Sequence, residues 1–297
     1  MTPLEHSALL WALGANLAFA VGVQFFTRYS RSVSSLWVNC SKALFATAAF
    51  LLTVLVGGGF HSIDPGMAGL FVASGALGLG LADVFILKSF ALMGPGRTLL
   101  LFGFQPLLVG SLSWLMFGQT VDPRRFLAIL FFVACLAVFS VESRRRTGRW
   151  EWRALLIAMA GMCFDSFGVI ITRYAFDASP GIAAMEGNLY RGLGAVLFFA
   201  VLSRWRPIDL AGRWRALSRS DRLMVAVGAF LGTYLSLAFY LRALRHGHLA
   251  SISGIAITGT LLASLFECLL ERRAPSRYHW TALVFFLGGM WTLFGFS

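Results

Sequence analysis

The 297 residues are 58% hydrophobic and only 13% charged, with a formal net charge of +12 and a mean hydropathy of +0.76. This composition is too apolar for a soluble domain of this size and excludes one. The arginines lie in short loops between apolar runs and not on one face of a soluble helix, so nucleic acid is not expected as a partner.

Apolar runs fill the chain almost end to end, and each is near the roughly 20 residues needed to cross a hydrocarbon core of about 30 Å. In chain order, the runs predict helices at 5–27, 34–57, 66–92, 96–118, 123–142, 151–174, 181–203, 221–245, 248–270 and 277–296. Glycine and proline fall where these helices should end, and no hydrophilic stretch is long enough for a soluble domain. The sequence therefore predicts an all-α integral membrane protein with ten transmembrane helices in one membrane unit.

The second five predicted helices repeat the first five at a nearly constant offset. The matching positions are Thr27-Arg28-Tyr29 with Thr172-Arg173-Tyr174, Asn39-x-x-Lys42 with Asn188-x-x-Arg191, and Gly80 with Gly232. Because five is an odd number of crossings, the second copy must be inverted relative to the first. We therefore expect two inverted five-helix repeats, at 1–146 and 147–297, an arrangement with which many secondary transporters build two gates around one central site.

The basic residues predict an orientation in the membrane. The loops that follow odd-numbered helices hold 17 arginines, whereas the loops on the other side hold five. The positive-inside rule then places the odd-numbered loops in the cytoplasm and both chain termini outside. We expect a multi-pass protein of a bacterial-type inner (plasma) membrane.

Ten helices in two halves of about 150 residues resemble the drug/metabolite transporter superfamily, EamA type. In that family the fourth and ninth helices often carry a mid-helix proline and a Gly-Glu-like end thirteen residues later, which Pro106 with Gly118-Gln119 matches in the first half. In the second half Thr258 replaces the proline, whereas Glu271 keeps the acidic end. The basic residues of the second and seventh helices are also similar to the family pattern. The resemblance implies a transporter of small molecules, although well-known members keep both termini in the cytoplasm.

Two carboxylates lie at membrane depth, where an ionised side chain usually faces a cavity or a partner. Asp165 lies near the middle of the sixth helix and has no partner in its own helix, so desolvation should favour its protonated form. It is the main candidate for exchanging a proton or holding a substrate ammonium group, and a structural ion pair is the alternative. Asp83 lies five residues before Lys88, a poor intrahelical spacing, so a partner on another helix is expected.

Polar residues also cluster on the second and seventh helices, with Glu186 among them. Asn39 and Lys42 share one face, as do Asn188 and Arg191, and two-fold symmetry would bring both faces to one cavity between the halves. The cavity should be lined by the first four helices and their repeat mates. The alternative for Lys42 and Arg191 is that each side chain extends to the lipid head groups.

Three further side chains complete the candidates. Trp37 and Tyr234 could stack on a substrate, but interfacial or packing roles are favoured for both. Glu267, near the end of the ninth helix, is expected to be a gating partner of an arginine.

No metal-ligand cluster, nucleophile elbow, phosphate-binding loop or ATPase module occurs in the sequence, so we expect neither an enzyme nor a bound cofactor. The leading hypothesis is a secondary carrier that exports small metabolites such as amino acids or amines, with proton coupling through Asp165 and with a monomer as the functional unit. The alternatives are a lipid-linked or hydrophobic-drug translocator of the same fold, and a membrane enzyme or sensor.

Overall fold

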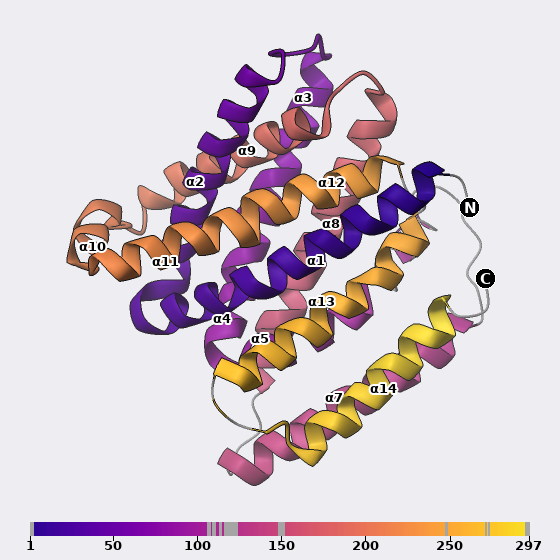
Figure 1. Cartoon of the computed structure of the whole chain (residues 1–297). Helices are drawn as coiled ribbons and strands as arrows, with labels where there is room; N and C mark the ends of the chain where they lie inside the picture. Colours follow the sequence, from indigo (N-terminus) through magenta and orange to yellow (C-terminus); the bar gives the residue numbers. More distant parts are fainter. Residues whose placement is uncertain are drawn as a thin grey trace.

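A computed structural model of the chain describes residues 3–105, 108, 111–112, 115, 124–147, 152–246, 249–270, 272 and 274–294. Within these ranges the regular secondary structure is helical, and no strand is present. The helices form one bundle around a buried interior (Figure 1).

The helices of the first half follow the apolar runs. They are α1 (Pro3–Tyr29), the π-helical segment η1 (Ser30–Ser34), α2 (Ser35–Val56), α3 (Pro65–Gly75), the π-helical segment η2 (Ala76–Ala82), α4 (Asp83–Met93), α5 (Pro95–Leu101), the short 3-10 helix η3 (Phe102–Phe104) and α7 (Arg124–Thr147). Local sequence sets several of these ends. The Asp64 side chain caps the first turn of α3, before Pro65, and Gly94 ends α4 at a φ of 87° that a side chain would disfavour.

The second half has a similar order. It contains α8 (Trp152–Ala178), α9 (Ala184–Ser203), the short α10 (Leu210–Ala216), α11 (Arg219–Ala229), the π-helical segment η4 (Phe230–Leu235), α12 (Ser236–His246), α13 (Leu249–Leu270) and α14 (Arg277–Phe294). Most bounds agree with the predicted spans to within a few residues. The count of ten spans stays a prediction, because the fourth span is described only in part.

Four helical stretches of the described residues are long and apolar enough to cross a membrane, judged by length and composition. They are Leu10–Val56, Pro65–Met93, Trp152–Ala178 and Arg219–Ala243. Exposed leucine side chains such as Leu52, Leu156 and Leu223 cover the outside of these helices, as expected where lipid is the solvent.

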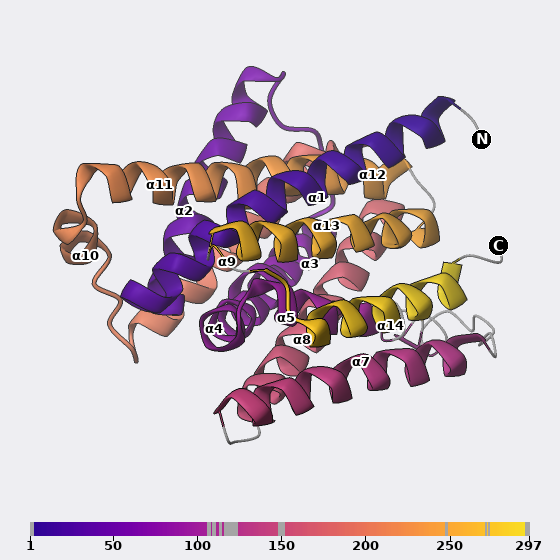
Figure 2. The ribbon, with the colours of Figure 1, turned by 60° about the horizontal axis from the view of Figure 1, so that its bottom comes forward.

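The helices of the two halves pair reciprocally. Helix α1 packs along α11, η4, α12 and α13, and α8 packs along α3, η2, α4 and α5 (Figure 1). Helix α2 packs against α9 between these groups. The remaining pair, α7 and α14, lies side by side at the edge of the bundle in both views (Figures 1 and 2).

Glycines allow the closest of these crossings. A Cβ atom at Gly22 of α1 would lie only 2.3 Å from the Cα of Gly232 in η4. A Cβ atom at Gly168 of α8 would lie 3.1 Å from the Cα of Gly78 in η2. The first helix of each half therefore crosses the π-helical segment of the other half with little space between the backbones.

The segments that follow the odd-numbered predicted helices meet at one end of the bundle. We call this end the odd-loop end. Arg31 Nε donates to the carbonyl of Ala91 at 3.1 Å, and Arg213 donates to the carbonyl of Val33 at 3.2 Å. The opposite end, called the even-loop end, holds the loops at 57–64 and 179–183.

Candidate functional site

The charged pair of the first half joins α2 to α4. Lys42 Nζ donates to Asp83 Oδ2, and the side chains are 7% and 16% exposed. The Lys42 ammonium also lies 5.1 Å from the ring centroid of Phe26 in α1. Asp83 thus has its partner on another helix, as its spacing from Lys88 predicted, and Lys42 is held inside the protein without extending to lipid head groups.

Asp165 and Arg191 lie near each other beside Gly78 of η2. Asp165 Oδ2 accepts a hydrogen bond of 2.8 Å from Gln105 Nε2. A Cβ atom at Gly78 would lie 3.6 Å from both Asp165 Oδ1 and a terminal nitrogen of Arg191. Arg191 is 2% exposed, and its Nε has no hydrogen-bond partner among the described residues. Arg191 is therefore buried in the protein and does not extend to the membrane surface, and the carboxylate and guanidinium are near neighbours without a direct hydrogen bond.

The two repeated asparagines hold the backbone of the interrupted helices. Asn39 Nδ2 donates to the carbonyls of Leu79 and Gly80 at 3.2 and 3.0 Å, and Asn188 Nδ2 donates to the carbonyl of Leu237 at 2.9 Å. A π-helical turn leaves carbonyls poorly satisfied within the helix, so these bonds stabilise η2 and the start of α12. Both Oδ1 atoms are buried without a partner in the described part of the chain. Among the described residues, Asn39 Nδ2 thus makes two bonds to backbone and Asn188 Nδ2 makes one, and the acceptor oxygen of each amide is left for another group.

A cavity of about 10 Å³ lies between the halves, close to the size of one water molecule. Its lining includes Lys42 and Asp83 from the first half, and Gly192, Thr233 and Leu237 from the second. The cavity is therefore lined from α2, η2, α4, α9, η4 and α12, which is narrower than the set of helices that the sequence predicted. In this conformation it is closed to any organic molecule.

The lining does not include Asp165, Asn188 or Arg191, and the two predicted aromatic contributors also lie away from the cavity. Trp37 is 1% exposed, donates from Nε1 to the carbonyl of Leu210 at 3.4 Å and stacks on Trp214 at the odd-loop end. The hydroxyl of Tyr234 lies 2.7 Å from the hydroxyl of Thr53, and its ring packs on Phe50. The stacking hypothesis is not supported for either residue, because both rings are used in packing.

The buried glutamates bind backbone groups near the ends of helices. Glu186, grouped with the central residues by sequence, accepts from His61 Nδ1 at 3.0 Å and from its backbone N–H at 3.2 Å, toward the even-loop end. Glu267 Oε2 accepts the backbone N–H of Gly96 at 2.8 Å, at the first turn of α5. Glu267 therefore joins α13 to α5 at the odd-loop end.

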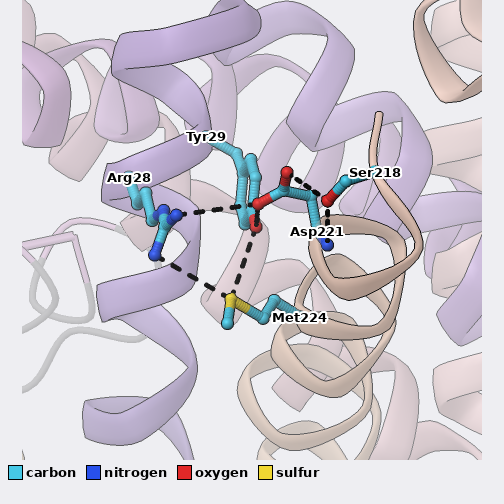
Figure 3. Close-up of polar contacts among 5 residues, drawn as sticks. All are labelled: Arg28, Tyr29, Ser218, Asp221 and Met224. Carbon is cyan, nitrogen blue, oxygen red and sulfur yellow. Dashed lines mark hydrogen bonds and ion pairs between the residues drawn. The ribbon is translucent and has the colours of Figure 1, made fainter. Parts of the chain in front are cut away.

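A polar cluster closes α1 onto α11 at the odd-loop end (Figure 3). Tyr29 Oη donates to Asp221 Oδ1 at 2.7 Å, and a terminal nitrogen of Arg28 lies 3.6 Å from the same oxygen. Ser218 Oγ donates to Asp221 Oδ2 at 2.7 Å, and it also accepts the backbone N–H of Asp221 at the start of α11. We call these residues, with the adjacent Met224, the Tyr29–Asp221 cluster.

The repeated motif in α8 makes different contacts. Arg173 Nε donates to Asp177 Oδ2 at 3.0 Å within the same helix, and Tyr174 is 47% exposed. Position 69 in α3 corresponds to position 221 at the repeat offset of 152, and it is a glycine. The second copy of Thr-Arg-Tyr thus has no carboxylate at the position that Asp221 occupies for the first copy.

A third group at the odd-loop end joins α5, α7 and α14. Arg97 donates to Glu142 Oε2 at 2.9 Å, and Ser276 donates to Glu142 Oε1 at 2.7 Å. One turn into α14, His279 contacts Ser264 of α13. Glu142 is 3% exposed, so its charge is stabilised by these donors and not by water.

Sequence reasoning missed Gln105, Glu142 and the Tyr29–Asp221 cluster. Gln105 and Glu142 are polar residues in apolar runs, which is the signal that selected Asp165 and Asp83. The cluster could have been found from the repeated Thr-Arg-Tyr triplet and the Ser-x-x-Asp capping pattern at Ser218. The family motif residues Pro106, Gly118, Gln119 and Glu271 lie outside the described residues.

Comparison with known proteins agrees with this picture. Residues 6–141 match the EamA-like transporter family. The chain is also similar to a chloroplastic WAT1-related protein of Arabidopsis thaliana, a member of the drug/metabolite transporter superfamily, with 26% identity over 172 residues. That match covers 56% of this chain and 40% of the relative, so the chain matches less than half the length of that protein.

The fold has also been seen before. A solved crystal structure superposes with a TM-score of 0.69 at 16% identity, over 97% of this chain and 96% of the other. At this identity the likeness concerns the fold alone. Together with the apolar helices, the family match over residues 6–141 points to a multi-pass membrane protein. The resemblance predicted from the sequence is thus confirmed over residues 6–141, which match the EamA-like transporter family.

Proposed function

We propose that this protein is a secondary active transporter that exports small organic metabolites, such as amino acids or amines, across a bacterial-type inner membrane by alternating access. The observation that carries the proposal is the set of charges where the two halves meet. Lys42, Asp83, Asp165 and Arg191 come from four different helices and lie inside the bundle. Buried charges at membrane depth cost free energy unless they are paired or used, and they are typical of substrate and proton pathways.

Asp165 is the residue that we assign to substrate or proton binding. Its bond to Gln105 is to a neutral amide, and Arg191 faces it from across Gly78 without a direct bond. A proton or a substrate ammonium group can therefore neutralise Asp165 without breaking an existing ion pair. Asp83, in contrast, already has its countercharge in Lys42.

The reciprocal packing supports the proposal that 1–146 and 147–297 are inverted repeats. Helix α1 crosses η4, α8 crosses η2, and Asn39 and Asn188 make matching bonds to the two interrupted helices. If a two-fold axis relates the halves, each helix of one half must make the contact that its counterpart makes in the other half. With the arginine bias, we assign the odd-loop end to the cytoplasm and both termini to the outside.

The closed cavity fits one state of an alternating-access cycle. The Tyr29–Asp221 cluster, Glu267 with Gly96, and Arg97 with Glu142 all join helices at the odd-loop end. We assign this conformation to a state closed toward the cytoplasm. Opening this end requires these contacts to separate while the opposite end closes.

The test is transport by purified protein in proteoliposomes, with labelled amino acids and amines and an imposed pH gradient. Asp165→Asn should abolish pH-dependent transport while leaving insertion intact, because Asn is nearly isosteric. Asp177→Asn in the same helix is the matched control, since Asp177 is exposed and pairs only locally. Normal transport by Asp165→Asn at every pH would assign the site to other residues, with Asp83 next. Failure of this variant to fold would favour a structural ion pair.

A translocator of lipid-linked or hydrophobic molecules is the second candidate, because an apolar groove of about 410 Å³ opens to the side of the bundle. This function would need a path from that groove to the centre. A lipid-scrambling assay on the same proteoliposomes separates the two candidates, because only the translocator should move labelled lipid.

A further inference from the structure

An apolar groove of about 410 Å³ runs between α2 and α11 beneath the short helix α10. All but one of its lining residues are apolar, and they are Ser41, Leu44, Phe45, Leu210, Ala211, Trp214, Val225, Ala226 and Ala229. Leu44 and Phe45 are 42% and 39% exposed on the outer face of α2. The groove thus lies on the surface that meets lipid, at the odd-loop end of the bundle, where α10 lies next to α11 (Figures 1 and 2).

Helix α10 is fixed in place over this groove. The Asp209 side chain caps it by accepting the backbone N–H of Gly212 at 2.8 Å. The carbonyl of Leu210 accepts from the indole of Trp37, and the ring of Trp214 stacks on Trp37 at a centroid distance of 6.3 Å. The apolar side of α10 therefore faces the groove as part of a built structure.

The segment that carries α10 has a large excess of positive charge. Residues 204–222 contain six arginines and two aspartates. Both aspartates are engaged, since Asp209 caps α10 and Asp221 binds Tyr29. On either side of Trp214, Arg213 binds only a backbone carbonyl, and Arg215 has no carboxylate partner in the described part of the chain. An anionic group from outside the chain would complement this charge.

We infer that the groove is a binding site for an anionic glycerophospholipid from the surrounding bilayer. One acyl chain lies along Leu44, Phe45 and Ala226, and the phosphate lies against Arg213 and Arg215 of α10. Apolar contact and charge attraction act together here, as they do for interfacial helices in general. The site is separate from the central charges, because the groove and the central cavity share no lining residue. We therefore assign the groove to a resident lipid and not to the transported molecule.

The experiment measures lipid retained by the purified full chain in detergent, with native mass spectrometry after addition of phosphatidylglycerol or phosphatidylcholine. We expect phosphatidylglycerol to be retained roughly tenfold better. Arg213→Gln with Arg215→Gln should remove this preference. Arg204→Gln with Arg206→Gln is the matched control, because it removes the same charge from the same segment outside α10.

A second pair of variants tests the groove itself. Ala226→Trp should fill it and reduce retention of both lipids, whereas Val227→Trp, which does not line the groove, should not. This pair decides the matter if the α10 arginine variant fails to fold. Equal retention of the two lipids by the unmodified chain, or equal losses in the two arginine variants, would overturn the site in favour of a general surface charge.

Discussion

The two copies of Thr-Arg-Tyr occupy matching places in the two halves, but they make different contacts. Tyr29 is 3% exposed and donates to Asp221 of the other half, whereas Tyr174 is 47% exposed and Arg173 binds within its own helix. The difference follows from one position, which is aspartate at 221 and glycine at 69. The same three-residue sequence can thus occur in both halves while only the first copy contacts a carboxylate of the other half.

The largest expected effect comes from removing the shared carboxylate. Asp221→Asn removes the charged acceptor for Tyr29, Ser218 and Arg28, so the open population of the odd-loop end should rise roughly fivefold. Spin labels at positions 32 and 220, in a chain whose four cysteines are replaced by alanine, report the separation by double electron–electron resonance. Asp177→Asn should leave the distance distribution unchanged. An unchanged distribution in Asp221→Asn would mean that the cluster does not hold this end closed.

A carboxylate at position 69, the counterpart of Asp221, tests whether the second Thr-Arg-Tyr copy can make the same contact as the first. Gly69→Asp gives α3 the residue that α11 has, and a Cβ atom at Gly69 would meet no atom within 4 Å. Because α3 packs along α8, the new carboxylate should bind Tyr174 or Arg173 and shift the population toward closure of the even-loop end by roughly threefold. Labels at positions 62 and 178 measure this shift. If Gly69→Asp with Tyr174→Phe and Arg173→Gln closes this end as much as Gly69→Asp alone, the repeat correspondence is wrong.

The smallest effect is expected for the outer charge of the cluster. Arg28 is 62% exposed in its side chain and 3.6 Å from Asp221, so Arg28→Gln should change the open population by less than roughly twofold. Tyr29→Phe removes the shorter, less exposed bond and should have the larger effect. The labels at 32 and 220 rank the two variants, and a larger effect of Arg28→Gln would show that attraction between charges dominates over the hydrogen bond.

Much of the fold could be predicted from the sequence, because helix length in a membrane follows from the length of the apolar run. The bounds of α2, α8 and α13 agree with prediction for this reason. The π-helical turns could not be predicted, since no apolar period distinguishes η2 from the α-helix on either side.

The candidate site was predictable in part. Asp83 and Asp165 were found because charge at membrane depth is rare, and their burial depends little on packing detail. The partners of these carboxylates depend on which helix faces them. The hydrogen bond from Gln105 to Asp165 could therefore be found only in the structure. The contact of Trp37 with α10 needed the structure for the same reason, because the apolar runs of the sequence predicted no helix at 210–216.

The π-helical segment η2 also determines the direction in which the Asp83 carboxylate points. Each residue of an α-helix turns the chain by about 100°, so one additional residue in a widened turn rotates everything that follows by about that angle. Asp83 is the first residue after η2 and its carboxylate points to Lys42. Deletion of one residue between 76 and 82 would restore a regular helix and turn position 83 toward a different neighbour, although no side chain in the pair had changed. Sequence alignments of the third helix must therefore place insertions and deletions at this segment before the acidic position can be compared between relatives.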